Sequence, residues 1–316
     1  MVKKVLAVHF SQTGQAAALL ENIVQPLREQ ADVSVTHVAL QVSPAFPFPW
    51  PFWRFLDSFP ETVALDPPPL VAVPLDGSQR FDLVILAYPV WFLSPPPPLT
   101  AFLQHPAARA VLRGRAVVTA TACRNMWVMA QETVKRLLRE AGARHLDHVA
   151  LVDRGSALAT FITTPRWVLT GRKDKFWGLP AAGVAEAELH DASRFGVALL
   201  QALRRGDETG DAPLLAGLGA CKVDPALVAS ERIGIRSFRL WGRALRAAGA
   251  PGAPARRALL CCYLVFLLAA IATVVPISLL VRRALTPLAG ERLERARRAY
   301  EAPSGSGVER LGHHHG

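Results

Sequence analysis

Residues 258–281 form a run of 24 residues that holds no charged side chain and is almost entirely apolar. About 20 apolar residues suffice for a helix to cross the hydrocarbon core of a bilayer. Arg256 and Arg257 precede the run, and Arg282 and Arg283 follow it, as expected for side chains that reach toward the two interfaces. We therefore predict a transmembrane helix here. The alternative is a buried helix of a soluble domain, which rarely lacks a polar face over this length.

Charge is distributed unevenly along the chain, whose formal net charge is +11. Residues 1–153 carry 13 Lys and Arg against 12 Asp and Glu, whereas residues 154–316 carry 23 against 13. A basic half is typical of a nucleic-acid binder or of a membrane protein with basic flanks. Because the excess surrounds the apolar run, we expect a membrane-lipid partner and no nucleic acid. Arginines lie on both sides of the run, so the sequence does not decide the orientation of the helix in the membrane. A hairpin and a half-inserted helix are also possible.

The basic excess begins in residues 230–257, an amphipathic juxtamembrane segment. Its arginines recur every three or four residues and so share one face of a predicted helix over 230–248: Arg232, Arg236, Arg239, Arg243 and Arg246. Such a face suits anionic headgroups, and an ordinary solvated helix face is the alternative. The Gly-containing residues 204–229 are interpreted as a linker, and residues 282–316 as a basic tail.

The first two thirds of the chain alternate short apolar runs with helical segments. Expected strands cover residues 5–9, 33–40, 83–87, 116–120 and 145–152, and expected helices cover 16–29, 99–103, 125–141 and 187–203. This alternation predicts an α/β fold with a parallel sheet covered on both faces. Two inserts interrupt it, namely residues 44–69, rich in proline and aromatic side chains, and the basic, irregular residues 153–180.

The first candidate site loop joins the first expected strand to the first helix. It comprises Ser11, Gln12, Thr13, Gly14 and Gln15. Hydroxyl groups, a glycine and backbone amides at the start of a helix can hold a phosphate. The loop has no lysine, so it is not the P-loop of a nucleoside triphosphatase. A simple helix cap by Ser11 or Thr13 is the alternative.

Two further loops follow the third and fourth strands. The loop after the third strand is aromatic and suits a flat ring; it comprises Tyr88, Pro89, Val90, Trp91 and Phe92. A core role for Trp91 and Phe92 is the alternative. The loop after the fourth strand can close the pocket with its backbone amides. It comprises Thr121, Cys123, Arg124 and Asn125. Cys123 is interpreted as a packed small side chain rather than a nucleophile. Arg124 could hold an anionic ring edge or phosphate, or form a surface salt bridge.

The cysteines and histidines give little evidence of metal chemistry. The four cysteines form no C-x-x-C pair, which argues against a disulfide scaffold or zinc ribbon and favours a reducing compartment. His145 and His148 are the only close histidine pair before the terminal run, and a regular strand would point them to opposite faces. We expect no metal site. The apolar run near the amino terminus is only about six residues long, so we expect no signal peptide either.

These motifs resemble a known family. The FSQTGQ loop resembles the FMN-phosphate loop of flavodoxins, and PVWFLSPPP resembles the flavin loop of NAD(P)H:quinone oxidoreductases. The resemblance implies a flavodoxin-like, doubly wound sheet of order 2-1-3-4-5, in which ligands bind where the loops after the first and third strands part. Ala16 departs from the family's hydroxyl residue. The segments FPFPW, CRNMWVMAQE, SERIGIRSFRLWG and YEAPSGS also resemble bacterial proteins labelled dialkylresorcinol condensing enzyme.

Taken together, we expect residues 1–203 to be a cytoplasmic flavodoxin-like domain held at a bacterial inner membrane. The resemblance implies FMN as cofactor, NAD(P)H as electron donor and a quinone or aryl lipid as electron acceptor. It also allows a homo-oligomer. Condensation of beta-keto acyl chains is one alternative, although thiolase-type condensation needs a cysteine with histidine or asparagine partners. A membrane scaffold that has lost FMN is another.

Overall fold

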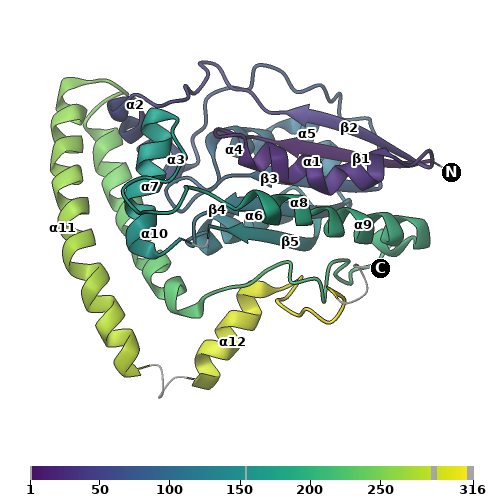
Figure 1. Ribbon diagram of the computed structural model, residues 1–316. Helices are drawn as coiled ribbons and strands as arrows, with labels where there is room; N and C mark the ends of the chain where they lie inside the picture. Colours follow the sequence, from purple (N-terminus) through teal and green to yellow (C-terminus); the bar gives the residue numbers. More distant parts are fainter. Residues whose placement is uncertain (1, 154, 286–289, 312–316) are drawn as a thin grey trace.

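A computed structural model describes residues 2–153, 155–285 and 290–311, and its sheet has the predicted order (Figure 1). Five parallel strands are arranged as β2-β1-β3-β4-β5. The strands are β1 (Lys3–His9), β2 (Val33–Ala39), β3 (Leu83–Tyr88), β4 (Ala116–Cys123) and β5 (Arg144–Val152). The prediction of a flavodoxin-like, doubly wound fold is therefore confirmed.

Helices follow most strands, as parallel connections require. Those of the sheet domain are α1 (Gln15–Arg28), α4 (Pro97–Gln104), α5 (Pro106–Leu112), α6 (Val128–Glu140), α8 (Glu186–Asp191) and α9 (Ser193–Arg205), followed by the short 3₁₀ helix η1 (Asp207–Thr209). The single helix expected over 187–203 is two helices. Ala192 interrupts it because its N–H bonds Leu189 O, three residues back rather than four, at 3.3 Å.

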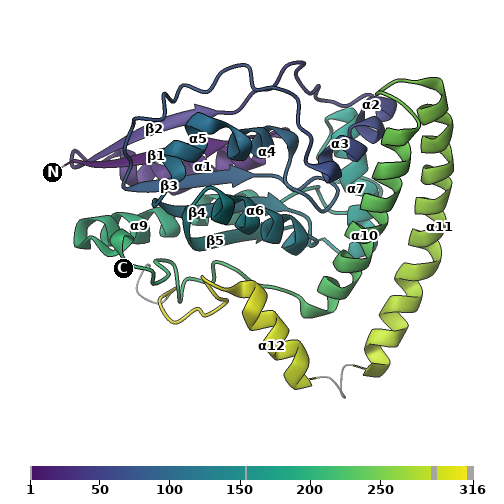
Figure 2. The same cartoon turned by 180° about the vertical axis from the view of Figure 1, so that it is seen from behind.

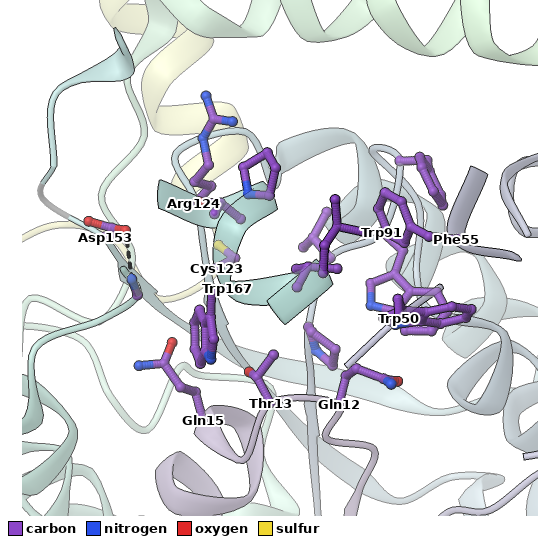
Figure 3. Close-up of a pocket in the computed structure, with 18 of the residues that line it drawn as sticks. Gln12, Thr13, Gln15, Trp50, Phe55, Trp91, Cys123, Arg124, Asp153 and Trp167 are labelled. Carbon is purple, nitrogen blue, oxygen red and sulfur yellow. Dashed lines mark hydrogen bonds between the residues drawn. The ribbon is translucent and has the colours of Figure 1, made fainter. Parts of the chain in front are cut away.

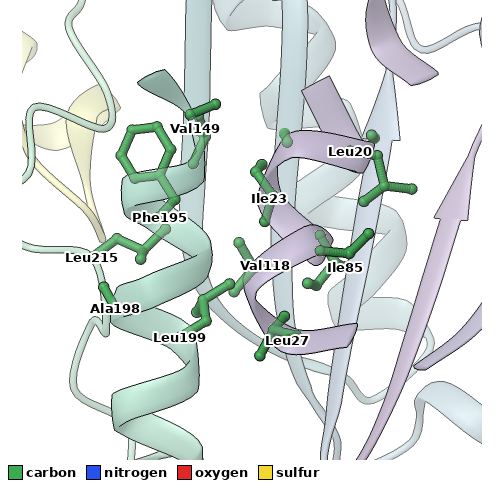
Figure 4. Packing of buried hydrophobic residues seen from close by; sticks show 14 of the residues in the cluster. Leu20, Ile23, Leu27, Ile85, Val118, Val149, Phe195, Ala198, Leu199 and Leu215 are labelled. Atoms are coloured by element: carbon green, nitrogen blue, oxygen red, sulfur yellow. The ribbon is translucent and has the colours of Figure 1, made fainter. Parts of the chain in front are cut away.

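Two apolar cores flank the sheet. On one face α1 and α9 pack together over β1, β3 and β4 (Figure 4). Leu20, Ile23 and Leu27 recur at helical spacing along α1, so the buried stripe of that helix is continuous. On the other face lie α4, α5 and α6, which come to the front when the molecule is seen from behind (Figure 2).

Both predicted inserts contain helices. Residues 44–69 form α2 (Phe52–Asp57) and α3 (Phe59–Ala64). Residues 153–180, expected to be irregular, contain α7 (Ala157–Thr170). Ser156 caps this helix by accepting the Ala159 N–H at 3.2 Å, and Gly171 ends it in a left-handed conformation. Four of the five basic residues of this insert lie near or after the end of the helix, whose first nine residues carry no charge, so the basic composition of the insert did not indicate a helix.

The segments interpreted as linker and tail are folded against the sheet. Leu214, Leu215 and Leu218 are buried in the core beneath α9. Residues 219–221 lie between β5 and the carboxy-terminal segment, because Ala150 N–H bonds Ala220 O at 2.8 Å and Cys221 N–H bonds Gly305 O at 3.1 Å. These leucines form an apolar face, and its burial is favourable, so the segment packs on the sheet domain instead of forming an exposed linker.

Three helices form an appendage beside the sheet: α10 (Pro225–Ala247), α11 (Pro254–Leu285) and α12 (Gly290–Glu301). In Figures 1 and 2, α11 runs away from the sheet and α12 returns toward it. Residues Pro254–Thr273 of α11 are long and apolar enough to cross a membrane, by length and composition alone. The side chains of residues 274–285, which include the end of the predicted run and Arg282 and Arg283, lie outside the description.

The arginines near α11 divide into two groups. Those of α10 are exposed, as the predicted amphipathic face requires: Arg232, Arg236, Arg239, Arg243 and Arg246. Arg257 is also exposed, and its guanidinium lies 5.0 Å from the ring centroid of Trp53. Arg256 is 1% exposed, and its ion pairs to Asp57 and Glu61 occupy it fully. Arg256 therefore does not reach toward a lipid interface, contrary to the expectation from the sequence.

Candidate functional site

The loops after β1, β3 and β4 meet at one cavity of about 430 Å³ (Figure 3). That volume lies within the range of about 300–1,000 Å³ typical of small-molecule sites. Nine of the predicted site residues line it: Gln12, Thr13, Gln15, Pro89, Val90, Trp91, Phe92, Cys123 and Arg124. The site lies at the carboxyl ends of the strands, between the two loops where the strand order reverses.

At the phosphate loop, α1 begins without a side-chain cap. Gly14 is its N-cap residue at φ 88°, and the first turn of this fully described helix has no acidic side chain. The Ser11 hydroxyl is buried and has no hydrogen-bond partner among the described residues. Free amides at the positive end of a helix, with a spare hydroxyl beside them, fit a phosphate group. This helix start therefore fits an anionic group such as a phosphate.

The neighbouring side chains of this loop are held by the first insert and by the chain that follows the second insert. Gln12 donates to Pro47 O at 2.6 Å. Gln15 binds the Val184 backbone twice, donating to its carbonyl at 2.9 Å and accepting from its N–H at 3.2 Å. Gly183 lies so close to Gln15 that a Cβ there would fall 2.6 Å from the amide oxygen. The chain after α7 is thus held directly against the phosphate loop.

The aromatic loop has two roles at once. Trp91 is 8% exposed and packs edge-on against Phe10, Phe46 and Trp50 at centroid distances of 5.1–5.6 Å, yet it also lines the cavity. Phe92 lines it too, and its ring lies 5.2 Å from that of Phe55. The core role and the site role, weighed as alternatives from the sequence, therefore coexist. The result is a rigid aromatic wall.

The β4 loop contributes one thiol and one cation. Burial raises the pKa of the Cys123 thiol well above its ordinary range, so it stays protonated. Burial also lowers the pKa of Arg124, which the nearby Asp153 partly offsets. The Arg124 guanidinium lies 4.3 Å from the ring centroid of Phe161, and its Nε has no hydrogen-bond partner among the described residues. Arg124 can therefore still donate to an anionic or carbonyl oxygen in the cavity.

Five predicted site residues do not line the cavity. Ser11 and Gly14 belong to the loop below it, and Asn125 follows Arg124 half-buried. Tyr88 is fully buried in the core and donates to Gln131, and the Thr121 hydroxyl donates to Tyr88 O at 2.8 Å. The phenol lies inside the sheet domain because β3 continues through Tyr88, so its side chain takes the alternation of the strand.

The expectation that His145 and His148 point to opposite faces is wrong. The pairing of β4 with β5 shifts between Val117 and Val118, which inserts one extra residue into β5. Both imidazoles therefore reach the Thr119 hydroxyl, at 2.9 Å each. Burial lowers the pKa of His145 to about 3 and that of His148 further below its usual range, so both stay neutral. They stabilise the interior and do not face the cavity.

The rest of the cavity comes from the inserts and was not predicted as part of the site. Trp50 precedes α2, Phe52, Phe55 and Leu56 lie on it, and α7 adds a second wall: Thr164, Pro165, Trp167, Val168 and Leu169. Ala122, Asp153 and Gly183 complete the lining. The aromatic density of residues 44–56 marked an apolar cover without showing which way it faces. In the described part of the chain, no three His, Cys, Asp or Glu residues are grouped as a metal site would need.

No family model and no curated protein matches the sequence, whereas solved structures do. A flavodoxin from the domain Archaea is 11% identical, with 64% of this chain and 99% of that chain covered and a TM-score of 0.35. An azoreductase from Bacillus anthracis str. Sterne is 14% identical, covering 61% and 100%, with a TM-score of 0.34. General stress protein 14 from Treponema denticola, solved with FMN, is 12% identical, covering 63% and 99%, with a TM-score of 0.31.

The fold assignment rests on the strand order of this chain itself, because likenesses this remote carry no argument about function. Five parallel strands in the order 2-1-3-4-5, with helices on both faces, define the doubly wound, flavodoxin-like class.

Proposed function

We propose that this protein is a membrane-anchored, FMN-binding oxidoreductase. The observation that carries the proposal is the uncapped start of α1 next to a cavity walled by aromatic side chains. The hydroxyl of Ser11, in the same loop, has no hydrogen-bond partner among the described residues. A phosphate is the anion that such a helix start accepts best, and an aromatic slot suits a flat ring. FMN carries both groups on one molecule.

The residues divide the work between binding and electrostatics. Ser11, Thr13 and the first amides of α1 would hold the phosphate. Pro89–Phe92 and Cys123 would line the ring. When bound, the flavin supplies hydride and electron transfer, which side chains cannot provide. Arg124 is already desolvated, and its Nε has no partner among the described residues, so it would stabilise negative charge that develops on the ring.

The acceptor side of the cavity is apolar. Phe52, Phe55 and Leu56 cover it from α2, the helix against which the amino-terminal end of α11 packs. A quinone or an alkyl-substituted aromatic lipid fits such surroundings and can be exchanged with a bilayer close by. NAD(P)H is the donor that the quinone-reductase resemblance implies. The second resemblance suggests the dialkylresorcinol class as the aromatic lipid.

Direct condensation of acyl chains is a poorer fit to Cys123. A condensing cysteine must be available as a thiolate, which needs a lowered pKa and a basic partner. Burial raises the pKa of Cys123, and no hydrogen bond from a histidine reaches it within the described chain. The inner membrane, with the sheet domain on the cytoplasmic side, is the proposed location.

The test is the visible absorption spectrum of the full chain purified in detergent. We expect a flavin spectrum that is lost in the Ser11→Ala/Thr13→Ala variant. The matched control is Ser34→Ala/Thr36→Ala, which removes two exposed hydroxyl groups from β2 and should leave the spectrum unchanged. A protein that stays colourless after incubation with FMN would refute the redox proposal.

A further inference from the structure

The amino-terminal end of α11 is bound tightly to the sheet domain. Arg256 donates to Asp57 Oδ1 at 2.6 Å and to the two Glu61 carboxylate oxygens at 2.6 and 2.7 Å, with a further bond to Asp57 O at 2.8 Å. Two turns on, the Tyr263 ring stacks on Phe59, with 4.7 Å between the ring centroids. These contacts place the start of the apolar helix on the same body as α2 and α3.

The chain returns to that same body after α12. Ser304, 3% exposed, accepts the His148 N–H at 2.6 Å and donates to Asp147 Oδ1 at 2.8 Å. Glu301, also 3% exposed, accepts the Val223 N–H at 3.0 Å. Gly219 N–H then bonds Gly307 O at 2.6 Å. Residues 301–307 are thus joined to β5 and to the segment beside it.

A single bilayer crossing by α11 is incompatible with both attachments. Such a crossing would deliver the next residues to the far side of a hydrocarbon core about 30 Å thick. A second crossing that returns the chain would have to be α12, but seven of its twelve residues are charged. Charged side chains at membrane depth are too costly for that role.

We propose that α11 binds one leaflet from the side that holds the sheet, so that the chain enters and leaves the membrane by the same face. This inference rests on the membrane part of the proposed function and changes its topology from spanning to one-sided. A helix of 32 residues is about 48 Å long, which is enough to lie along or dip into one leaflet without crossing it.

The exposed face of α11 fits lipid as its occupant. From residue 258 to residue 273 that face holds no charge, and Val265 and Leu268 are 69% and 58% exposed. The opposite face packs on α10 through Leu260, Tyr263 and their neighbours. The neighbouring α10 carries five exposed arginines, and Arg257 is exposed at the start of α11. An apolar strip with cations close by matches the acyl chains and anionic headgroups of one leaflet.

Cysteine labelling of the full chain in membrane vesicles tests this topology. In a Cys261→Ser/Cys262→Ser background, we would introduce Val308→Cys in the carboxy-terminal segment or Lys175→Cys in the sheet domain, both at exposed positions. A membrane-impermeant maleimide should label both in vesicles of one orientation, with labelling of both lost in the opposite orientation. Labelling of the two positions in opposite orientations would overturn the proposal and establish a spanning helix.

Vesicle binding tests the choice of lipid as occupant. On vesicles of phosphatidylglycerol and phosphatidylcholine, Val265→Lys/Leu268→Lys should lose most of the binding of the unaltered chain. Val71→Lys, at a valine that is 61% exposed on a loop of the sheet domain, should keep it. Equal binding of both variants, or no binding by the unaltered chain, would refute the lipid-facing surface. The flavin spectrum is read from the same samples, so a failure of the cofactor proposal is seen separately.

Discussion

Two contact regions hold the parts of the molecule together, and they differ in chemistry. The contact of α1 with α9 over the sheet is apolar throughout (Figure 4), and Gly196 on α9 lets the two helices approach closely. The contacts of the appendage contain buried ionisable groups instead: Arg256, Glu231 and Asp147. Apolar packing is independent of pH, whereas a buried charge stabilises only when its partner is present. The appendage is therefore the conditional part of the fold.

Glu231 shows how the appendage meets the site. It lies on α10, is fully buried and accepts the Met129 N–H at 2.8 Å at the start of α6, a helix without a side-chain cap of its own. A carboxylate at a helix start is favourable. Burial nevertheless raises the pKa of Glu231 to about 7. The loop of Cys123 and Arg124 runs directly into this contact.

The largest expected effect is at Arg256. In Arg256→Gln the carboxylates of Asp57 and Glu61 keep their charge and lose their partner, which should cost about 3–4 kcal/mol. Urea unfolding in detergent, followed by tryptophan fluorescence, measures it. Arg243→Gln on the exposed face of α10 is the control, with an expected change below about 0.5 kcal/mol. Equal effects of the two substitutions would mean that the buried ion pairs do not hold α11.

The second largest loss of stability is expected at the apolar contact of α1 with α9. A Cβ at Gly196 would lie 2.0 Å from the backbone oxygen of Ile23, so Gly196→Ala should destabilise by about 3 kcal/mol, the upper end for overpacking. Gly242→Ala in α10 is the matched change, because its Cβ meets the movable Val63 side chain at 2.8 Å. It should cost less than half as much in the same unfolding assay. The reverse order would contradict the distinction between a rigid core and a yielding appendage.

Acid should strengthen the contact at Glu231. A carboxyl group whose folded pKa lies above its unfolded value takes up protons more readily when folded, so it favours the folded state as pH falls from about 7 toward 4.5. Glu231→Gln mimics the protonated form. At pH 8 this variant should be about 2 kcal/mol more stable than the unaltered chain, and the difference should vanish near pH 4.5. A difference that does not change between these pH values would show that Glu231 is not strained by burial.

The smallest effect concerns the carboxy-terminal segment. Ser304→Ala removes one hydrogen bond to Asp147 and leaves the His148 N–H without its partner, for a cost of about 1–2 kcal/mol. Burial already raises the pKa of Asp147 to about 6, and loss of the Ser304 bond should raise it further. The variant should therefore lose most stability at neutral pH and least near pH 4. Ser306→Ala, whose hydroxyl donates to Glu301 at 2.8 Å, compares a neighbouring bond in the same segment.

Local patterns predicted the sheet and its loops well, because a strand, a tight loop and an amphipathic helix are each encoded within a few residues. The cavity walls from α2 and α7 were beyond such reasoning, since which way Trp50 or Trp167 faces depends on distant backbone. The histidine pair failed for a related reason: one extra residue in β5 changes the face on which His145 lies. The docking of Ser304 on Asp147 joins residues 157 positions apart, and nothing near either residue signals it.

The pairing of residues 219–221 with residues 305–307 also sets the order in which the protein can be completed. β5 lies at one end of the sheet, and its Ala150 N–H bonds Ala220 O in the segment beside it. The outer side of that segment, residues 219–221, receives its partners from residues 305–307. During synthesis residues 305–307 leave the ribosome after α11, so the outer side of residues 219–221 stays unpaired until the apolar helix has already emerged. An open edge invites pairing with other chains. Completion of the sheet domain therefore depends on residues made after α11, so the nascent chain exposes this edge and the apolar helix at the same time.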